Sequence, residues 1–307
     1  QQSVIDLLDE LRLAYGSIQV LGTPRRLVVY IEDLAARQPD LSQEVKGPPA
    51  DRAFDESGQP TRAAEGFARS KGVDPKDLEV KVIDGGEYVV ALVEQEGQSA
   101  TEVLSKELPG LIGKIRFNKS MRWNESGVTF SRPIRWLMAL HGETVVPFSF
   151  AGYSSGRETR GLRFSKDEKF SVKDPDDSYD KLGNQGIILD PEKRKKMIKD
   201  QADALAEEVG GRISFDKDLL DEVTGLVEKP RAFRGKYDDK YLDSLPPEVL
   251  TSVMKKHQRY FVVEDEFSQL MPYFVGVRNG SDDYLDIVTD GNEQVILHTT
   301  GLRAMPH

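Results

Sequence analysis

The chain has 307 residues, of which 38% are apolar, a size and composition that suit about two domains with buried cores. Its 52 acidic and 42 basic residues give a formal net charge of −10, which argues against a uniformly basic nucleic-acid binder but leaves room for a local basic face. The absence of cysteine excludes disulfides, thiolate metal sites, iron–sulfur clusters and cysteine nucleophiles. The apolar runs are too short for a membrane helix of about 20 residues.

Helix and strand patterns alternate along the first half of the chain. The expected elements are, in order, a helix at 4–15, a strand at 27–31, a loop at 38–59, a helix at 61–71, strands at 78–83 and 88–94, a helix at 100–115 and short strands within 132–150. Three prolines and two glycines indicate the loop. Thr61 and Gly72 suit the two ends of the helix between them, and Asp84 and Gly85 are typical of a hairpin turn.

The second half of the chain is richer in helical patterns. Asp190 followed by Pro191 is typical of a helix start, and it opens a long helix at 190–209. The other expected elements are helices at 216–227 and 246–257 and strands at 260–263 and 271–277. A charge-rich stretch at 165–181 indicates a domain boundary. The sequence therefore predicts an α+β fold of two mixed domains, 1–165 and a helix-rich 166–297, with an aberrant tail at 298–307.

Several kinds of active site are excluded by missing motifs. The four histidines, at 141, 257, 298 and 307, form no HExxH motif and no other metal-ligand spacing. Neither the P-loop pattern nor the Rossmann GxGxxG pattern occurs. Tandem acids such as Asp176 and Asp177 are typical of solvated surface. The sequence therefore predicts no catalytic residue, no metal site and no cofactor site in this chain.

A basic and aromatic stretch at 114–135 stands out against the acidic background. It holds six basic residues and one acid, with aromatic residues between them. Cations neutralise phosphates and aromatic faces stack on bases, so the mixture suits an RNA ligand. Equally, the aromatics can be core and the bases can pair with acids in three dimensions. The RNA-binding candidates here and in the following basic cluster are Arg116, Lys119, Arg122, Trp123, Arg132, Arg135, Arg160 and Arg163.

A second basic segment lies at 246–261. Leu250, Met254 and His257 share one face of the expected helix, so His257 is expected to face the core or to cap the helix. The bases off this face are further RNA-binding candidates: Lys255, Lys256 and Arg259.

Seven segments, in order along the chain, resemble the β subunit of bacterial-type glycyl-tRNA synthetase. They are residues 22–27, 46–48, 60–68, 119–123, 130–137, 254–261 and 272–280. The first contains the signature residues Thr23, Pro24, Arg25 and Arg26, and the sixth contains His257 and Gln258. The resemblance alone assigns these six residues no role, and the aliphatic stems of Arg25 and Arg26 can cover the adjoining strand.

The resemblance implies a division of labour with a partner. In that family the α part carries the class II catalytic core, which binds glycine, ATP and Mg²⁺, and the β part mainly contacts tRNA. It therefore implies the tRNA-recognition part of glycine–tRNA ligase, an aminoacyl-tRNA synthetase of protein biosynthesis, non-catalytic as a chain. The implied partners are glycine tRNA and a separate or fused α part, in an assembly of two α and two β; neither membrane nor DNA is implied. Lys119, Arg122, Arg132 and Arg135 are expected on the tRNA-facing side.

Two departures from the family pattern bear on origin and completeness. Leu162 stands where bacterial members usually have histidine, which favours the plastid or mitochondrion of a plant or alga over a bacterial-type cytoplasm. The start at Gln1 and the aberrant tail favour a truncated piece. Two other functions stay open: an RNA-binding or assembly fragment without a role in aminoacylation, and an editing hydrolase. The latter is less favoured because a glycine pocket excludes larger amino acids sterically.

Overall fold

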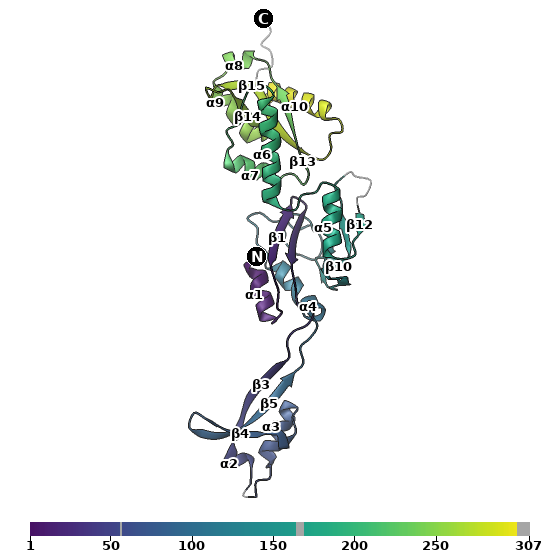
Figure 1. Cartoon of the computed structure of the whole chain (residues 1–307), viewed down its shortest axis with the longest axis vertical. Coiled ribbons are helices and arrows are strands. Elements are labelled where there is room, and N and C mark those ends of the chain that lie inside the picture. Colours follow the sequence, from purple (N-terminus) through teal and green to yellow (C-terminus); the bar gives the residue numbers. More distant parts are fainter. Residues whose placement is uncertain (56, 164–168, 300–307) are drawn as a thin grey trace. The chain divides into compact units, whose positions relative to one another are not determined.

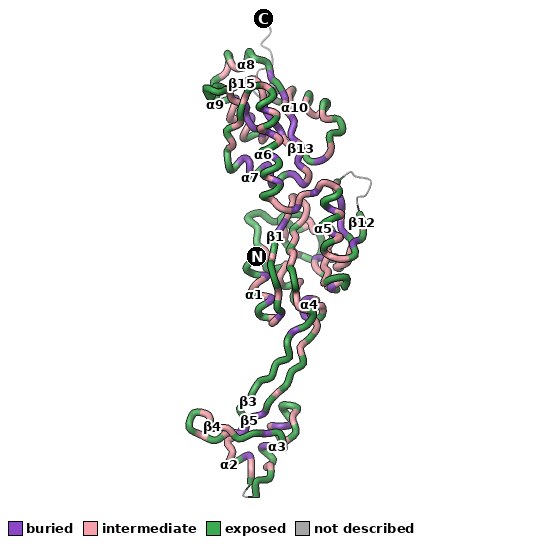
Figure 2. Tube along the Cα trace, in the orientation of Figure 1, coloured by how far each residue is buried: buried purple, intermediate pink, exposed green. Residues whose placement is uncertain are grey.

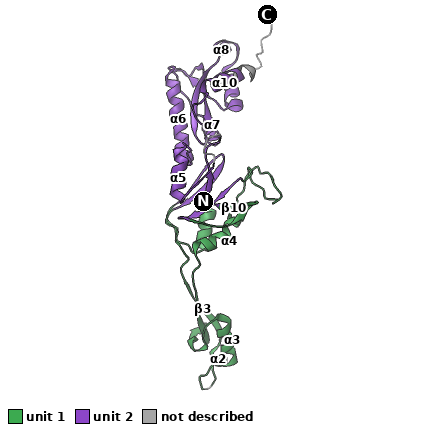
Figure 3. Ribbon diagram, turned by 90° about the vertical axis from the view of Figure 1, so that its right-hand side faces the viewer, with its two compact units in different colours: residues 1–17, 32–134, 144–155 green, residues 18–31, 135–143, 156–307 purple. Residues whose placement is uncertain are grey.

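The computed structural model describes residues 1–55, 57–163 and 169–299, and its mixture of helices and strands confirms the α+β class. These residues form two compact units, each assembled from separate segments (Figure 3). Unit 1 comprises the described residues of 1–17, 32–134 and 144–155, and unit 2 comprises those of 18–31, 135–143 and 156–299. The expected boundary at 165/166 and most of the expected tail at 298–307 lie outside the described residues. The division into domains 1–165 and 166–297 stays a prediction.

Unit 1 contains two helices that pack on one another. These are α1 (Gln2–Glu10), which buries Val4 and Leu8, and α4 (Ala100–Gly113). Ser99 and Glu102 form a reciprocal capping box at the start of α4. It provides acceptors for two backbone N–H groups that have no carbonyl partner because no helical turn precedes them. The short strands β8 (Thr144–Val145), β9 (Ser149–Phe150) and β10 (Tyr153–Gly156) follow later in the chain, and β9 pairs with β10 in antiparallel fashion.

Unit 1 also contains a three-stranded antiparallel sheet. Its order is β3 (Leu41–Pro49), β5 (Gly86–Gln95) and β4 (Glu79–Ile83). The helices α2 (Ala50–Ala53) and α3 (Arg62–Lys71) lie beside it, and η1 (Pro75–Asp77) precedes β4 (Figure 1). The core between them consists of small and branched side chains: Ala53, Ala64, Ala68, Leu78, Val89 and Ala91.

The expected loop at 38–59 was wrong, because β3 and α2 occupy most of it. β3 is an edge strand, and its prolines stand at its end, where the register with β5 shifts between Lys46 and Pro49. Proline is tolerated at edges and bulges because no ladder N–H is needed there. By contrast, Thr61 does cap α3 and Gly72 ends it in the left-handed conformation, as the sequence predicted.

Unit 2 begins with the hairpin of β1 (Ile18–Thr23) and β2 (Arg26–Ile31), whose two-residue turn is Pro24 and Arg25. Shorter elements follow: β6 (Leu137–Met138), β7 (Leu140–His141), β11 (Glu158–Arg160), β12 (Lys169–Ser171) and α5 (Pro175–Asn184). The hairpin packs on the α5 region through an apolar cluster of Leu21, Leu182, Ile187 and Leu189.

A second antiparallel sheet forms the main core of unit 2. Its order is β13 (Pro230–Lys236), β15 (Leu270–Asn279) and β14 (Phe261–Glu264). Alternate residues of these strands face opposite sides, and each side belongs to its own cluster of buried side chains. Figure 2 shows the buried segments of this part of unit 2 in purple. One side packs on α6 (Pro191–Glu207) and α7 (Lys217–Thr224). The other packs on α8 (Lys240–Ser244), α9 (Pro247–Ser252), the π-helix η2 (Val253–Gln258) and α10 (Leu285–Thr299).

We expect Ile198→Ala to destabilise unit 2 by about 2–5 kcal/mol, because the side chain is fully buried between α6 and the sheet and its removal leaves a cavity. The adjacent Met197 is 40% exposed, so Met197→Ala is the matched control and should change little. Urea unfolding followed by circular dichroism measures both variants. Equal shifts would contradict the placement of this core.

Candidate nucleic-acid interface

A single buried carboxylate holds the signature turn of unit 2. Glu228 is 1% exposed, and its Oε1 accepts a hydrogen bond of 2.6 Å from the Thr23 hydroxyl. Its Oε2 lies 3.2 Å from Nη1 of Arg25, and its Oε1 lies 3.0 Å from Nη2 of Arg26. Thr23, Arg25 and Arg26 thus owe their position to one acid that lies about 200 residues away in sequence.

Arg26 and Trp136 lie in the same buried environment. The Arg26 side chain is 4% exposed, and its Cζ lies 5.8 Å from the centroid of the Trp136 ring, while that of Arg160 lies 5.5 Å from it. Burial lowers the pKa of Arg26, and Glu228 opposes this shift. These contacts are cation–π interactions. Trp136 and Arg160 therefore already contact residues of their own unit.

Glu228 is itself fixed by its backbone. Its N–H donates to Oδ1 of Asn279 at 2.7 Å, and its carbonyl accepts from the N–H of Ile188 at 2.9 Å. The N–H of Gly22, on the hairpin, donates to the carbonyl of Leu189 at 3.0 Å. These hydrogen bonds fix the backbone of Glu228 and the backbone of the hairpin. They therefore fix where the Glu228 carboxylate lies relative to the hairpin turn.

In unit 1, the basic stretch is an extended loop after α4, which we call the basic loop (residues 114–134). Met121 and Phe130 bridge its two arms by backbone hydrogen bonds of 2.8 and 3.2 Å. The rings of Phe117 and Phe130 meet edge to face at 4.6 Å between centroids. Asn124 donates to the carbonyl of Ala151 at 2.8 Å. The aromatic residues of this loop therefore support its shape from within.

The cations of the basic loop are exposed. Across the described parts of the chain, no acidic side chain lies within ion-pair distance of the four basic candidates, which are Arg116, Lys119, Arg122 and Arg132. Arg116 bonds only the carbonyl of Gly113, at 2.9 Å. Trp123 is half-buried, so less of its face is open for stacking. Cations in water that no acid neutralises are what a phosphate backbone requires.

The last candidate of the basic stretch, Arg135, and the two candidates of the following basic cluster belong to unit 2. Arg135 and Arg163 are exposed, and Arg160 is half-buried on Trp136. Leu162, at the position of the departure from the family pattern, packs against the apolar cluster beneath the hairpin.

The second basic segment has a geometry that the sequence did not predict. The expected helix at 246–257 is α9 followed by η2, in which backbone bonds span five residues rather than four. Leu250 and Met254 are buried as expected, but the wider turn rotates His257 out, so the expectation of a core-facing His257 was wrong. The turn ends at Arg259, whose φ of 58° is left-handed.

Two of the three cations in this segment are paired with acids in α7 or at its N-cap. Nε of Arg259 lies 2.9 Å from Glu222, and Nζ of Lys255 lies 3.9 Å from Asp216. Lys256 is exposed, and Gln258 is half-buried. The segment therefore offers less unpaired positive charge than the basic loop.

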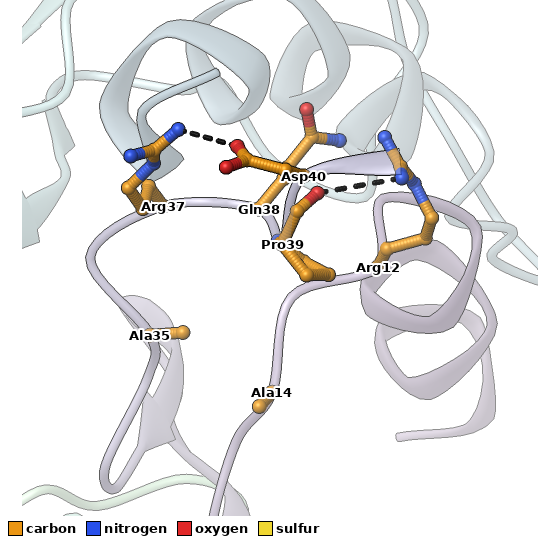
Figure 4. A pocket seen from close by; sticks show the side chains of 7 residues that line it. All are labelled: Arg12, Ala14, Ala35, Arg37, Gln38, Pro39 and Asp40. Carbon is orange, nitrogen blue, oxygen red and sulfur yellow. Dashed lines mark hydrogen bonds and ion pairs between the residues drawn. The ribbon is translucent and has the colours of Figure 1, made fainter. Parts of the chain in front are cut away.

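Two further features of the described residues can be judged as candidate sites by their contacts: a hollow in unit 1 and a serine motif in β10. A shallow hollow of about 400 Å³ in unit 1 is lined by Arg12, Ala14, Ala35, Arg37, Gln38, Pro39 and Asp40 (Figure 4). Its cations are engaged, since Arg37 contacts Asp40 at 2.7 Å and Arg12 contacts the carbonyl of Pro39 at 3.4 Å. The segment 152–156 matches the GxSxG pattern, but Ser154 lies in β10, hydrogen-bonded to Ser149, and not at a strand-to-helix turn.

Two absences concern the described residues alone. There, no group of three or more His, Asp or Glu side chains is placed to hold a metal ion. In the same residues, no helix is both long and apolar enough to cross a membrane.

Sequence reasoning found the signature turn but missed its acid. Glu228 stands in an ordinary-looking Val-Glu-Lys-Pro segment just before β13. The available signal was an imbalance: two adjacent arginines before an apolar strand need a counter-charge if one of them is buried, because an unpaired buried cation is strongly unfavourable. Many acids in the chain can supply it, so the partner was not identifiable from the sequence.

Comparisons with known proteins agree on one family. The model of the family described as "Glycyl-tRNA synthetase beta subunit" matches residues 1–298. The chain is 49% identical over 95% of its length to "Glycine--tRNA ligase, chloroplastic/mitochondrial 2" of Arabidopsis thaliana and covers 27% of that protein. It is 46% identical over 96% of its length to the "Glycine--tRNA ligase beta subunit" of Desulforamulus reducens and 42% identical over 94% to that of Bacillus subtilis. It covers 42% of each of these two bacterial proteins, so the chain spans less than half the length of these relatives.

We expect Glu228→Gln to lower the free energy of unfolding of unit 2 by about 3–5 kcal/mol, because Arg26 would stay buried without a counter-charge. Glu266 is exposed, so Glu266→Gln removes the same charge as a matched control and should stay within about 0.5 kcal/mol. Urea unfolding at neutral pH compares the two variants. A Glu228→Gln shift as small as that of the control would contradict the central role of this carboxylate.

Proposed function

The chain belongs to the glycyl-tRNA synthetase β-subunit family, and from this premise we propose that it is the tRNA-recognition part of a glycine–tRNA ligase. The observation that carries the proposal is the basic loop, whose exposed cations have no acidic partner among the described residues although the whole chain is acidic. Such cations bind phosphates, and their positions on a loop fixed by internal aromatic contacts favour a structured RNA over a free nucleotide.

Within this proposal the cations have different tasks. Lys119, Arg122 and Arg132 contact the tRNA backbone, with Arg116, Arg135, Arg163 and Lys256 as further contacts. Arg25 and Arg26 are structural, since both are held against the buried carboxylate of Glu228. Arg160, Lys255 and Arg259 are less available because of their contacts with Trp136, Asp216 and Glu222.

We further propose that the chemistry resides in a partner. An α part binds glycine and ATP with Mg²⁺ and transfers glycine to the tRNA, and it is either a separate subunit or fused in one polypeptide. Two α and two β chains form the assembly. The 42–49% identity to proteins named as glycine–tRNA ligases or their β subunits supports this partner. The proposal includes neither a membrane nor DNA.

We propose an organellar compartment, plastid or mitochondrion, over a bacterial-type cytoplasm. The support is the 49% identity to an Arabidopsis protein named chloroplastic/mitochondrial, together with Leu162 in place of histidine.

We expect the triple variant Lys119→Ala, Arg122→Ala, Arg132→Ala to weaken binding to glycine tRNA and to flatten its salt dependence. Each lost phosphate contact lowers the log–log salt slope by about 0.7–0.9, so three contacts lower it by about 2–3. The matched control is Lys173→Ala, Lys196→Ala, Lys240→Ala, which removes equal charge from lysines that are paired with acids. Filter binding or fluorescence anisotropy across a salt series measures both, and equal slopes for the two variants would contradict the assignment.

We expect the chain alone to catalyse no glycine-dependent ATP–pyrophosphate exchange, and exchange to appear when an α chain is added. The reason is the proposed division of labour, in which glycine, ATP and Mg²⁺ bind to the α part. Exchange by the purified chain without α would contradict the proposed division of labour.

A further inference from the structure

Helix α3 has one packed face and one face that none of the described residues covers. Ala64 and Ala68 are completely buried against the sheet of unit 1, with Phe67 beside them. On the opposite face, Arg62 and Arg69 are exposed, at positions i and i+7. Gly66 lies between them at i+4, so the three form one line along the helix.

This outer face departs from what helix stability alone would select. Arg62 stands in the first turn, where the helix dipole favours acids over cations. Gly66 stands in the middle of the helix, where glycine is less favourable than alanine. Two local departures on a single exposed face are typical of a functional surface.

Packing inside the chain does not explain Gly66. Apart from the neighbouring residues and backbone of α3 itself, a Cβ atom added there would meet no heavy atom of the described residues within 4 Å. Gly47, on the neighbouring β3, is a contrast, since a Cβ there would lie 2.6 Å from the Phe67 ring. Gly47 is thus required by the contact between β3 and α3, whereas a side chain at Gly66 would meet only what approaches from outside.

The charges of this face are not neutralised by their surroundings. In the described part of the chain, no acidic side chain lies within ion-pair distance of Arg62, Arg69 or Lys71. Glu65, at the side of the face, stands in the first turn, where it favours the helix dipole. Residues 40–97 contain thirteen acids and seven bases, so the line of cations is a local feature and not part of a basic module.

The chemistry of the face favours a nucleic-acid backbone over a protein. A protein interface has a core of apolar or aromatic side chains, and this face has none, since Ser70 and Glu65 flank the line. A sugar–phosphate strand needs separated cations and a close approach to the surface, which Arg62, Arg69 and Gly66 supply.

We propose that the outer face of α3 is a second tRNA contact, in which Arg62 and Arg69 bind backbone phosphates on either side of a strand that approaches closely over Gly66. This inference rests on the proposed tRNA-binding function and adds a surface outside the basic loop. The contact reads no base sequence, because the face has no aromatic side chain for stacking and arginines on phosphates position a strand without reading it.

The first test is the double variant Arg62→Gln, Arg69→Gln in the full chain, with glycine tRNA across a salt series. We expect affinity to fall about tenfold and the log–log slope to fall by about 1.4–1.8, as for two lost phosphate contacts. The matched control is Lys46→Gln, Lys81→Gln, which removes two cations of the same sheet module that contact Asp84 and Glu44. The control should leave both quantities unchanged.

The second test separates a binding role of Gly66 from a folding role. Gly66→Leu places a side chain on the line between the arginines and should weaken tRNA binding several-fold. It should also leave the melting temperature unchanged or raise it, because leucine forms helices better than glycine. Gly110→Leu in α4 is the matched control, since a Cβ at that exposed helical glycine is equally unobstructed, and it should not affect binding.

The outcomes distinguish this inference from the proposed function. If the α3 double variant binds tRNA like the unmodified chain while the basic-loop variant is weakened, the α3 contact is overturned and the proposed function stands. If the unmodified chain binds no tRNA at low salt, both are overturned. If the double variant keeps its RNA affinity but captures less of a catalytic α chain, the face binds protein and the inference is overturned. Weakening by the double variant and by Gly66→Leu, with both controls unaffected, supports it.

Discussion

The carboxylate of Glu228 is the point on which the arrangement of unit 2 depends. It accepts a hydrogen bond from Thr23 and contacts Arg25 and Arg26, and Asn279, the last residue of β15, accepts from the backbone N–H of Glu228. One acid thereby joins the hairpin of β1 and β2 to the region where β13 and β15 meet. This contact fixes the position of the hairpin, because a buried carboxylate or a buried guanidinium is strongly destabilising unless the opposite charge lies beside it.

This constraint divides the arginines and lysines of the protein into two groups. Cations with buried or paired positions, such as Arg26 and Arg259, already have their counter-charges and hold the structure together. Cations of the basic loop and of the outer face of α3 have none among the described residues, so they remain available to phosphates. A net charge of −10 does not conflict with RNA binding on this view, because binding depends on where unpaired cations gather and not on their total.

The sequence predicted those elements whose ends carry local chemical signals. Thr61 and Gly72 marked α3, and Asp190 with Pro191 marked α6, because caps act within a few residues of the bond they complete. The prediction failed where neighbours decide the outcome. The 38–59 segment forms β3 only because β5 offers it a ladder, and η2 turns His257 outward although the apolar spacing favoured a regular helix. Neither effect has a signal within its own segment.

For function, the sequence by itself determined the family, the absence of the common nucleotide-loop motifs and the basic character of residues 114–135. These depend on residue types and spacing, which do not change on folding. Only the tertiary structure decided which cations form ion pairs within the chain, because pairs such as Glu228 with Arg25 join residues 203 positions apart. It also decided that Arg62, Gly66 and Arg69 form one exposed line, since which face of a helix stays open is set by what packs against the other face.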